Sequence, residues 1–416
     1  MIKALKSKIR LLLLKLSFFL QTDMRYVATQ GSWLASGQML NNLISFFTAI
    51  AFANLLPKET FGSYRYILSI FGLFSLTTMP GMESAVIRTV AEGFENVYRK
   101  VITRRILWGL AGSLGALITA GYYFSKNNSL LGYACIIIAA AVPFFEPVGT
   151  YSHILTGKKR FDIRARYYSY TRLVSAVVII LTILATKSLI LLLVAYFVPY
   201  IIMGFLLAGP ALRRLNLNDK FDESVFHYGK HFNLISLISM GVNYLDGIIV
   251  FHFLGPIQLA IFSIAQAPVN RIQSLFGIIP DIALPKYAEK TVEQIKTDIF
   301  KKILKATIIT GLIVLIYIVS APFLFKLFLP KYADSVIFTQ IVALTIVLYP
   351  FILITRIRTA KGSVRALYIY NIAESATQLI VMLVMISQFG LLGAVWGKVF
   401  VALVGTGIQF YFIKTL

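Results

Sequence analysis

Long apolar runs alternate with short polar connections from about residue 30 to the end of the chain. Most runs are close to the ~20 residues that a helix needs to cross a bilayer. The fourth run contains Pro143 and Pro147, which predicts a kink, and a tight turn at residues 186–188 separates the fifth run from the sixth. The pattern predicts twelve transmembrane helices, near residues 31–56, 63–82, 103–124, 130–153, 167–186, 188–208, 232–254, 259–280, 303–325, 335–355, 366–387 and 391–413.

Composition agrees with this pattern. Hydrophobic residues make up 58% of the chain and charged residues 14%, whereas soluble domains average about 25% charged residues. The mean hydropathy is +0.78. We therefore expect an all-α polytopic membrane protein without a soluble domain. Residues 1–29 are basic and apolar without a small-residue cleavage site, which predicts an amphipathic helix on the membrane surface rather than a removed signal peptide.

The basic residues are distributed unevenly between the two sides of the predicted membrane. The amino-terminal segment and every second connection carry most of the 40 lysines and arginines. The alternate connections, which are all short, hold only Lys58, Lys126, Lys187, Lys326 and Lys331. The positive-inside rule then predicts that both termini are cytoplasmic. The net charge of +23 faces the cytoplasmic leaflet, so nucleic acid is not needed as a partner to explain it.

The two halves of the chain resemble each other at an offset near 200 residues. "NLLPKETFGSYRY" (54–66) matches "FLGPIQLAIFSIA" (253–265), and "MPGMESAVIRTVAEG" (79–93) parallels "IPDIALPKYAEK" (279–290). "PFFEPVGTYSHILTGKKRF" (143–161) parallels "PFILITRIRTAKGSVR" (350–365). Six plus six spans give both halves the same orientation, as in a parallel repeat.

This repeat predicts the organisation of the chain. After the amino-terminal segment 1–29, we expect an N-lobe over 30–210 that holds spans 1–6. A cytoplasmic linker over 211–231 would connect it to a C-lobe over 232–416 that holds spans 7–12. Transporters of this kind hold their substrate between two lobes and rock them to alternate access.

Several segments resemble the polysaccharide transporter branch of the multidrug/oligosaccharidyl-lipid/polysaccharide (MOP) exporters, the Wzx-type flippases. They are "GSWLASGQMLNNLISFF" in span 1, "LPKETFGSYRYILS" after it, "MPGMESAVIRTVAEG" after span 2 and "LDGIIVFHFLGPIQLAIFSIA" across spans 7 and 8. The resemblance covers roughly residues 30–416. It implies two six-helix lobes in a V around a cationic cavity, with twelve spans where the lipid II branch has fourteen.

The resemblance also implies a function. Wzx-type flippases move an undecaprenyl-diphosphate-linked oligosaccharide, such as an O-antigen repeat unit, from the cytoplasmic to the periplasmic leaflet of the bacterial inner membrane. A polysaccharide polymerase and a chain-length regulator would then be partners. No nucleotide-binding or metal-binding motif is present, so we expect no cofactor.

Charges inside the spans are the candidate functional residues, because each costs about 2.5–3.5 kcal/mol at the bilayer centre. Arg65 lies near the start of span 2. It either contacts the substrate diphosphate between the lobes or extends its guanidinium group to the membrane–water interface. Arg271 lies in the middle of span 8, where its guanidinium suits a diphosphate or an ion pair with Asp246. Asp246 is then either an ion-coupling carboxylate or the counter-charge of Arg271.

Four more in-span charges have two interpretations each. Arg172 in span 5 extends to the interface or pairs with Glu146. Glu146, between the two prolines of span 4, acts in function, as in ion coupling, or pairs with Arg172. Glu374 in span 11 faces a watery cavity or bonds a neighbouring helix. Lys398 in span 12 lines the substrate cavity or pairs with Glu374.

Span 1 is unusually polar for a lipid-facing helix. It includes Gln38, Asn41 and Asn42, which suit sugar hydroxyls but equally suit hydrogen bonds between helices. We expect them to line the cavity and bind substrate.

Two other functions compete with a flippase. A cation-coupled drug antiporter of the MATE branch should favour acidic cavity residues, whereas the clear in-span charges are four basic and three acidic side chains. A membrane polymerase or ligase is expected to have a long periplasmic loop that carries catalytic residues. The predicted connections on the outer side are all short, which argues against that function.

Overall fold

The computed structural model describes residues 24–276, 292–355 and 364–414, and every regular element in those ranges is helical. Most of the predicted amino-terminal surface helix lies outside the described residues. The described elements are α2 (Met24–Leu55), α3 (Lys58–Ser75), η1 (Leu76–Thr78), α4 (Met82–Ala91), α5 (Tyr98–Ser125), α6 (Ser129–Phe145), η2 (Pro147–Gly149), α7 (Thr150–Gly157), α8 (Phe161–Ala185), α9 (Leu189–Arg213), α10 (Ser224–Phe276), α12 (Val292–Phe328), η3 (Pro330–Ser335), α13 (Val336–Leu348), η4 (Tyr349–Phe351) and α15 (Val364–Lys414).

These helices account for the predicted spans. Within the described ranges, eight segments are long and apolar enough to cross a membrane, and α3 with α4, bent by 44°, makes a ninth. Two of the eight are double length and break at Gly255 and Gly390, so each supplies two spans. With α2, the described chain has the twelve spans that the hydropathy pattern predicts.

The predicted interruptions are also confirmed. α6 ends at Phe145, and the chain passes through the short 3₁₀ turn η2 before α7 continues. Pro143 and Pro147 lack the amide hydrogen that an unbroken helix needs, which explains the break. Residues 186–188 form the tight connection between α8 and α9.

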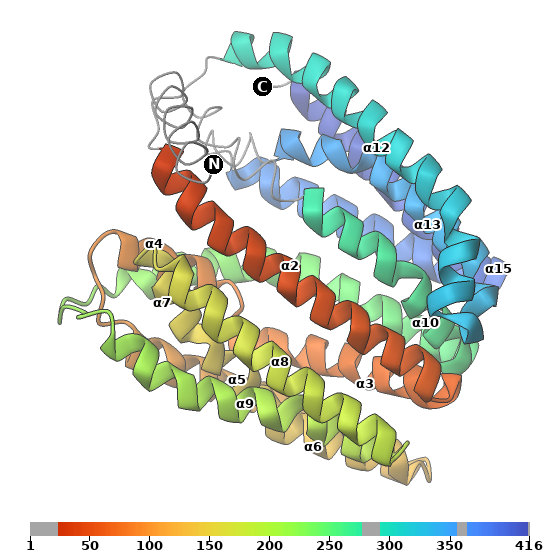
Figure 1. Ribbon diagram of the computed structural model, residues 1–416, viewed down its shortest axis with the longest axis horizontal. Coiled ribbons are helices and arrows are strands. Elements are labelled where there is room, and N and C mark those ends of the chain that lie inside the picture. Colours follow the sequence, from red (N-terminus) through yellow and green to blue (C-terminus); the bar gives the residue numbers. More distant parts are fainter. Residues whose placement is uncertain (1–23, 277–291, 356–363, 415–416) are drawn as a thin grey trace, which may run out of the picture.

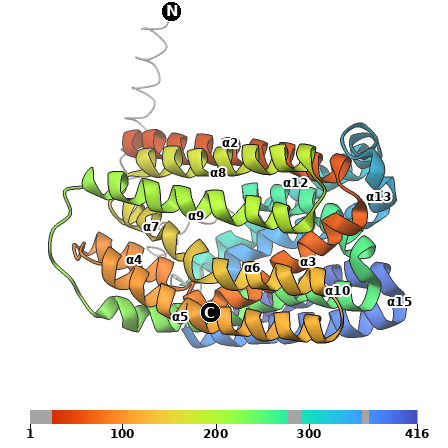
Figure 2. The same cartoon turned by 90° about the horizontal axis from the view of Figure 1, so that it is seen from below.

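The helices form two halves in a V (Figure 1). Helices α2–α9 make one half, the N-lobe, and α10, α12, α13 and α15 make the other, the C-lobe. Figure 2 shows α2 and α8 side by side on one face of the N-lobe. Helices α2 and α12 converge at one end of the molecule and diverge toward the other (Figure 1).

The lobes are joined most closely along α3 and α10. Any Cβ at Gly62 would overlap the carbonyl of Pro256, and any Cβ at Gly72 would overlap the ring of Tyr244. Glycine at these positions therefore allows the two helix backbones to approach. One apolar core continues across this seam from the N-lobe into the C-lobe.

At the converging end, polar contacts also link the lobes. Asn54 donates from Nδ2 to the carbonyl of Phe328 at 2.7 Å, and Lys58 Nζ lies 2.6 Å from Asp334 Oδ2. We call this pair of contacts the end latch. Its lysine and aspartate are partly exposed, so the ion pair alone contributes little stability.

The predicted repeat has a structural counterpart at each lobe's first helix pair. The chain turns at Pro57 between α2 and α3, and at Gly255–Pro256 inside α10. Gly255 has φ of +83° with no atom crowding its Cβ position. Glycine is therefore favoured there by backbone conformation, not by lack of space.

The outer faces of the lobes are apolar. Large exposed side chains recur at helical spacing on α5, at Leu107, Leu110, Leu114 and Ile118, and α12 carries a similar row. Soluble proteins rarely expose such continuous apolar surface. These faces suit the hydrocarbon interior of a bilayer.

A short segment between α9 and α10 is anchored to the N-lobe. The backbone amide of Asn218 donates to Glu95 at 2.9 Å, and Lys158 Nζ donates to the same carboxylate at 2.5 Å. Burial acts to raise the pKa of Glu95, but these hydrogen bonds outweigh it and hold the pKa below its ordinary value. Phe221 adds a cation–π contact with Lys100 at 3.6 Å. The segment is thus clamped to one lobe.

Candidate functional site

Three in-span arginines come from helices of both lobes, and we call them the arginine triad: Arg65 on α3, Arg172 on α8 and Arg271 on α10. Arg65 is exposed and donates from Nε to Ser263 Oγ of the other lobe at 3.2 Å. Arg65 therefore takes part in the contact between the lobes.

Arg172 and Arg271 lie on opposite lobes but within electrostatic range, so their charges repel. The hydroxyl of Tyr168 accepts hydrogen bonds from Arg172 Nε and Nη2 at 3.1 and 2.8 Å. Tyr196 lies within range of both Arg65 and Arg172. Repulsion of this kind is relieved by an anion bound between the cations.

The N-lobe also contains a partly open pocket of about 410 Å³, here called the N-lobe pocket. Its volume is in the range of small-ligand sites. Arg172 belongs to its wall, so the pocket adjoins the triad. Polar side chains from α2, α4, the α6–α7 break, α8 and α9 line it, among them Gln38, Asn41, Glu83, Glu146, His153, Arg164, Tyr168, Arg172, Tyr196 and Tyr200.

Close packing of α2 on α8 brings the span 1 amides to this pocket. A Cβ at Gly37 would lie 3.0 Å from the Cβ of Ala165, so the small residue at 37 sets the helix separation. Gln38 and Asn41 both line the pocket, and Gln38 donates from Nε2 to Asn42 Oδ1 at 3.2 Å. The structure thus places two of the three predicted span 1 residues in the pocket lining, while Asn42 is outside the lining and bonds to Gln38.

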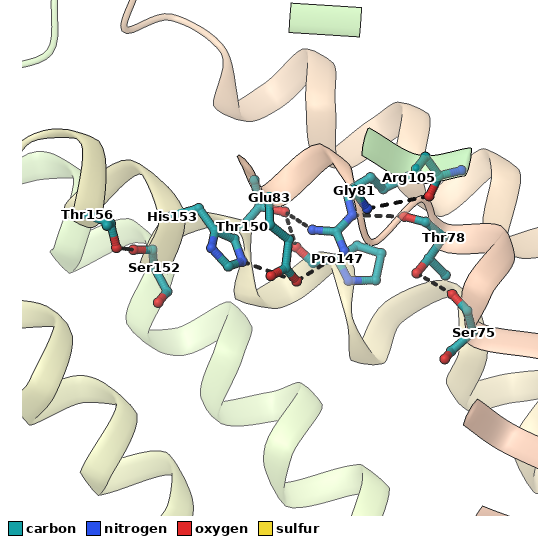
Figure 3. Close-up of polar contacts among 11 residues, drawn as sticks. Ser75, Thr78, Gly81, Glu83, Arg105, Pro147, Thr150, Ser152, His153 and Thr156 are labelled. Atoms are coloured by element: carbon teal, nitrogen blue, oxygen red, sulfur yellow. Dashed lines mark hydrogen bonds and ion pairs between the residues drawn. The ribbon is translucent and has the colours of Figure 1, made fainter. Parts of the chain in front are cut away.

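Figure 3 shows a cluster of polar contacts around Arg105, and two of its members, Glu83 and His153, also line the N-lobe pocket. Arg105 donates to the carbonyl of Thr78 at 2.9 Å and to Thr150 Oγ1 at 3.1 Å. Glu83 lies between Arg105, at 3.9 Å, and His153 Nε2, at 3.4 Å. The side chain of Arg105 is 1% exposed, so it fastens the α3–α4 bend to the α6–α7 break.

Sequence reasoning missed this cluster. Arg105 stands near the end of a basic connection and was expected to face the cytoplasm. Its burial follows from the depth at which α5 packs against η1. Glu83 and Arg105 are too far apart along the chain for their spacing to indicate a pair.

Glu146 was predicted to act in function or to pair with Arg172. Among the described residues, no cation lies within ion-pair distance of its carboxylate, although Arg105 and Arg172 act on it at longer range. Glu146 is half-buried and lines the N-lobe pocket. The carboxylate is therefore directed toward the pocket without an ion-pair partner from the described chain.

The C-lobe has a different arrangement. Asp246 forms an ion pair with Lys398, and Gln378 Nε2 donates to the same carboxylate oxygen at 2.7 Å. The expected pairing of Asp246 with Arg271 is not what the structure shows, because Asp246 pairs with Lys398, and the charge that acts most strongly on Arg271 is that of Arg172 of the other lobe. The pairing of Lys398 with Glu374 is likewise corrected: the ion-pair partner of Lys398 is Asp246.

Glu374 instead forms a hydrogen bond with Tyr370 of its own helix, and the charge of Lys398 acts on it only at longer range. Tyr370 also accepts a hydrogen bond from Gln409 at 2.9 Å. The predicted polar stripe of span 11 continues through Ser375 and Gln378, which are both buried. This stripe bonds neighbouring helices inside the C-lobe.

The two arrangements differ in what they can bind. The triad offers guanidinium groups, whose planar donors match phosphate oxygens. The N-lobe pocket offers hydroxyl, amide and carboxylate groups in a small volume. The described residues hold no group of three or more His, Cys, Asp or Glu side chains suited to a metal ion.

Comparison with known families gives one match. A family described as polysaccharide biosynthesis protein matches residues 27–286, well over half of the chain. Among curated protein sequences, no significant match was found.

Solved structures show the same fold at low identity. An outward-facing multidrug resistance MATE transporter of the MOP superfamily is 15% identical with a TM-score of 0.67, over 92% of this chain and 94% of that one. The lipid II flippase MurJ, in an inward closed conformation, is 13% identical with a TM-score of 0.63, over 91% and 87%. A MOP superfamily transporter from Pyrococcus furiosus, described as having a binding pocket of reverse polarity, is 16% identical with a TM-score of 0.64, over 94% of each chain.

Proposed function

Because the chain belongs to the polysaccharide biosynthesis protein family, we propose that it is a flippase for lipid-linked oligosaccharides. Its fold is that of a MOP transporter, and family and fold together indicate a membrane transporter rather than an enzyme. The proposed substrate is an undecaprenyl-diphosphate-linked repeat unit of a surface polysaccharide such as O-antigen. The proposed direction is from the cytoplasmic to the periplasmic leaflet of the bacterial inner membrane.

The arginine triad is the observation that carries this proposal. A diphosphate is the one feature that all such substrates share, and it brings negative charge into the membrane. Arg172 and Arg271 come from opposite lobes and repel each other. A diphosphate between them would neutralise that repulsion and draw the lobes together. Charged groups inside a membrane protein are retained for such roles because they are costly to bury.

The end latch suggests which step of transport the structure represents. With the termini on the cytoplasmic side, as the distribution of basic residues predicts, the latch lies at the periplasmic end. The lobes are then closed toward the periplasm and diverge toward the cytoplasm. A lipid-linked headgroup would enter from the inner leaflet and leave after the latch opens.

The competing antiporter function has less support. A drug or cation antiporter needs a carboxylate available to a cation in its transport path. Asp246 is already paired with Lys398. Glu146 has no ion-pair partner in the described chain, but the pocket that it lines also contains Arg164 and Arg172, which disfavour a cation there.

Deletion of the gene in its host tests the proposal. We expect a carrier-linked repeat unit to accumulate on the inner leaflet and surface polysaccharide to be lost. Normal surface polysaccharide with altered drug tolerance would contradict the flippase and favour an antiporter.

The site is tested by Arg271→Ala, which should abolish surface polysaccharide at unchanged protein level. The matched control is Lys126→Ala, an exposed outer-side residue away from the triad. Full export by Arg271→Ala would remove this arginine from the diphosphate site.

A further inference from the structure

We propose that the N-lobe pocket is a sugar subsite that holds an uncharged, hydroxyl-rich sugar of the substrate beside the arginine triad. The proposal rests on the flippase function and names the class of sugar that its substrate carries. Arg172 makes the connection, because it belongs both to the pocket wall and to the triad. A diphosphate bound at the triad would place its attached sugar at the pocket.

The charges of the pocket favour a neutral ligand. Its lining contains two arginines, Arg164 and Arg172, and two glutamates, Glu83 and Glu146. It also contains His153. Glu83 is drawn toward Arg105 and His153. A second phosphate or a uronic acid would meet two carboxylates there, and a basic sugar would meet two guanidinium groups.

Glu146 further restricts the ligand. A carboxyl group forms hydrogen bonds with hydroxyl groups, and the described chain supplies no ion-pair partner for that of Glu146. A ligand hydroxyl at this wall can therefore bond to it. Sugar hydroxyls both donate and accept hydrogen bonds, whereas ionised phosphate oxygens only accept them. Gln38 and Asn41, on the opposite helix, add amide groups that both donate and accept.

Aromatic rings give the pocket an ordered wall. Phe145 stacks on Tyr200 with ring centroids 4.2 Å apart and on Tyr196 at 5.5 Å, with interplanar angles of 24° and 19°. All three residues line the pocket. Such rings combine an apolar face with a polar hydroxyl, which matches the C–H face and hydroxyl edge of a sugar ring.

Binding of purified full-length protein to defined lipids tests the subsite. The probes are undecaprenyl diphosphate alone and the same lipid carrying glucose, N-acetylglucosamine or glucuronic acid. We expect at least one of the two neutral glycolipids to bind roughly tenfold more tightly than the bare lipid, which corresponds to one or two good hydrogen bonds. The glucuronic acid lipid should bind more weakly than the preferred neutral one.

Two variants remove the proposed sugar contacts. Glu146→Gln keeps the shape but removes the charge, and Tyr200→Ala removes one ring of the wall. In each, the preference for the neutral glycolipid over the bare lipid should fall toward one. The matched controls are Glu59→Gln and Tyr170→Phe, which change exposed residues outside the pocket lining and should keep the preference. Thermal unfolding of each variant checks that it is folded.

The outcomes separate this proposal from the flippase itself. If the wild type binds bare and glycosylated lipids equally, or prefers the glucuronic acid lipid, the neutral sugar subsite is wrong while the flippase stands. If folded Glu146→Gln and Tyr200→Ala keep the full preference, the pocket is not where the sugar binds. If the wild type binds none of these lipids, the flippase proposal fails and the subsite fails with it.

Discussion

Both lobes contain polar side chains inside a membrane helix bundle, but the polar side chains are partnered differently in each. In the N-lobe, α2, α8 and α9 surround a pocket whose carboxylate Glu146 has no ion-pair partner in the described chain. In the C-lobe, the corresponding helices of the repeat are α10 and the two arms of α15. There, Asp246 and Lys398 pair with each other and Gln378 completes the cluster.

The repeat brings related positions to these two places. Asn42 and Asp246 lie about 200 residues apart, as do Tyr196 and Lys398, and Arg172 and Gln378. The members of each pair lie on corresponding helices of the predicted repeat. These helices hold a charge pair in the C-lobe, whereas Arg172 and Tyr196 line a pocket in the N-lobe.

This difference separates a structural role from a binding role. A buried charge that is paired within the protein has little left to offer a ligand, whereas an unpaired polar wall does. We therefore assign substrate contact to the N-lobe and the triad, and lobe stability to the C-lobe pair. Four substitutions, each followed by a measurement of the free energy of unfolding, test that assignment.

The largest effect is expected from Asp246→Asn. It leaves Lys398 without its counter-charge in the interior, which should cost about 3–5 kcal/mol of unfolding free energy. Detergent-driven unfolding of the purified protein measures the loss. The double variant Asp246→Leu with Lys398→Met should recover most of it, since neither charge remains. A single variant as stable as the wild type would show that the pair is not structural.

A smaller loss is expected from Arg105→Met, which tests the buried cluster beside the pocket. The variant loses hydrogen bonds to Thr78 and Thr150, at a cost of about 2–3 kcal/mol. The same unfolding measurement applies. Arg104→Met, an exposed neighbour on α5, is the control. Equal effects of the two changes would contradict the anchoring role of Arg105.

The clamp at Glu95 should contribute less, because it lies outside the lobe interiors and Lys158 is partly exposed. Glu95→Gln should lose about 1.5 kcal/mol at pH 7. The folded-state pKa of Glu95 lies below its unfolded value, so the stabilisation is present above about pH 4.3 and is lost as pH falls through the folded pKa. Unfolding of both proteins from pH 7 to pH 3 should show the difference shrink. A difference that grows on acidification would contradict this.

The smallest effect is expected from Glu146→Gln, at about 0.5 kcal/mol or less, because no ion pair to a described residue is lost. Its contrast with Asp246→Asn is the sharpest test of the comparison between the lobes. If Glu146→Gln destabilised the protein as much as Asp246→Asn, the N-lobe carboxylate would be structural too.

The fold was largely predictable because each span must satisfy its own backbone hydrogen bonds in lipid. Helix number, the proline break before α7 and the turn between α8 and α9 follow from local residues. The candidate site was predictable only in part. Gln38 and Asn41 do line one pocket, but Asn42 does not, and the partners of Asp246, Lys398 and Glu374 do not follow from depth in the membrane.

The sequence by itself determined which segments enter the bilayer, how the basic residues divide between its sides, and which charges are buried in a span. Those properties depend on the cost of moving each segment from water into lipid, which is a local sum over residues. Only the tertiary structure decided that Asp246 meets Lys398, that Arg271 faces Arg172, and that Arg105 is buried. Those contacts depend on the rotation of each helix about its axis and on its neighbours, which small residues such as Gly37 and Gly62 set through packing.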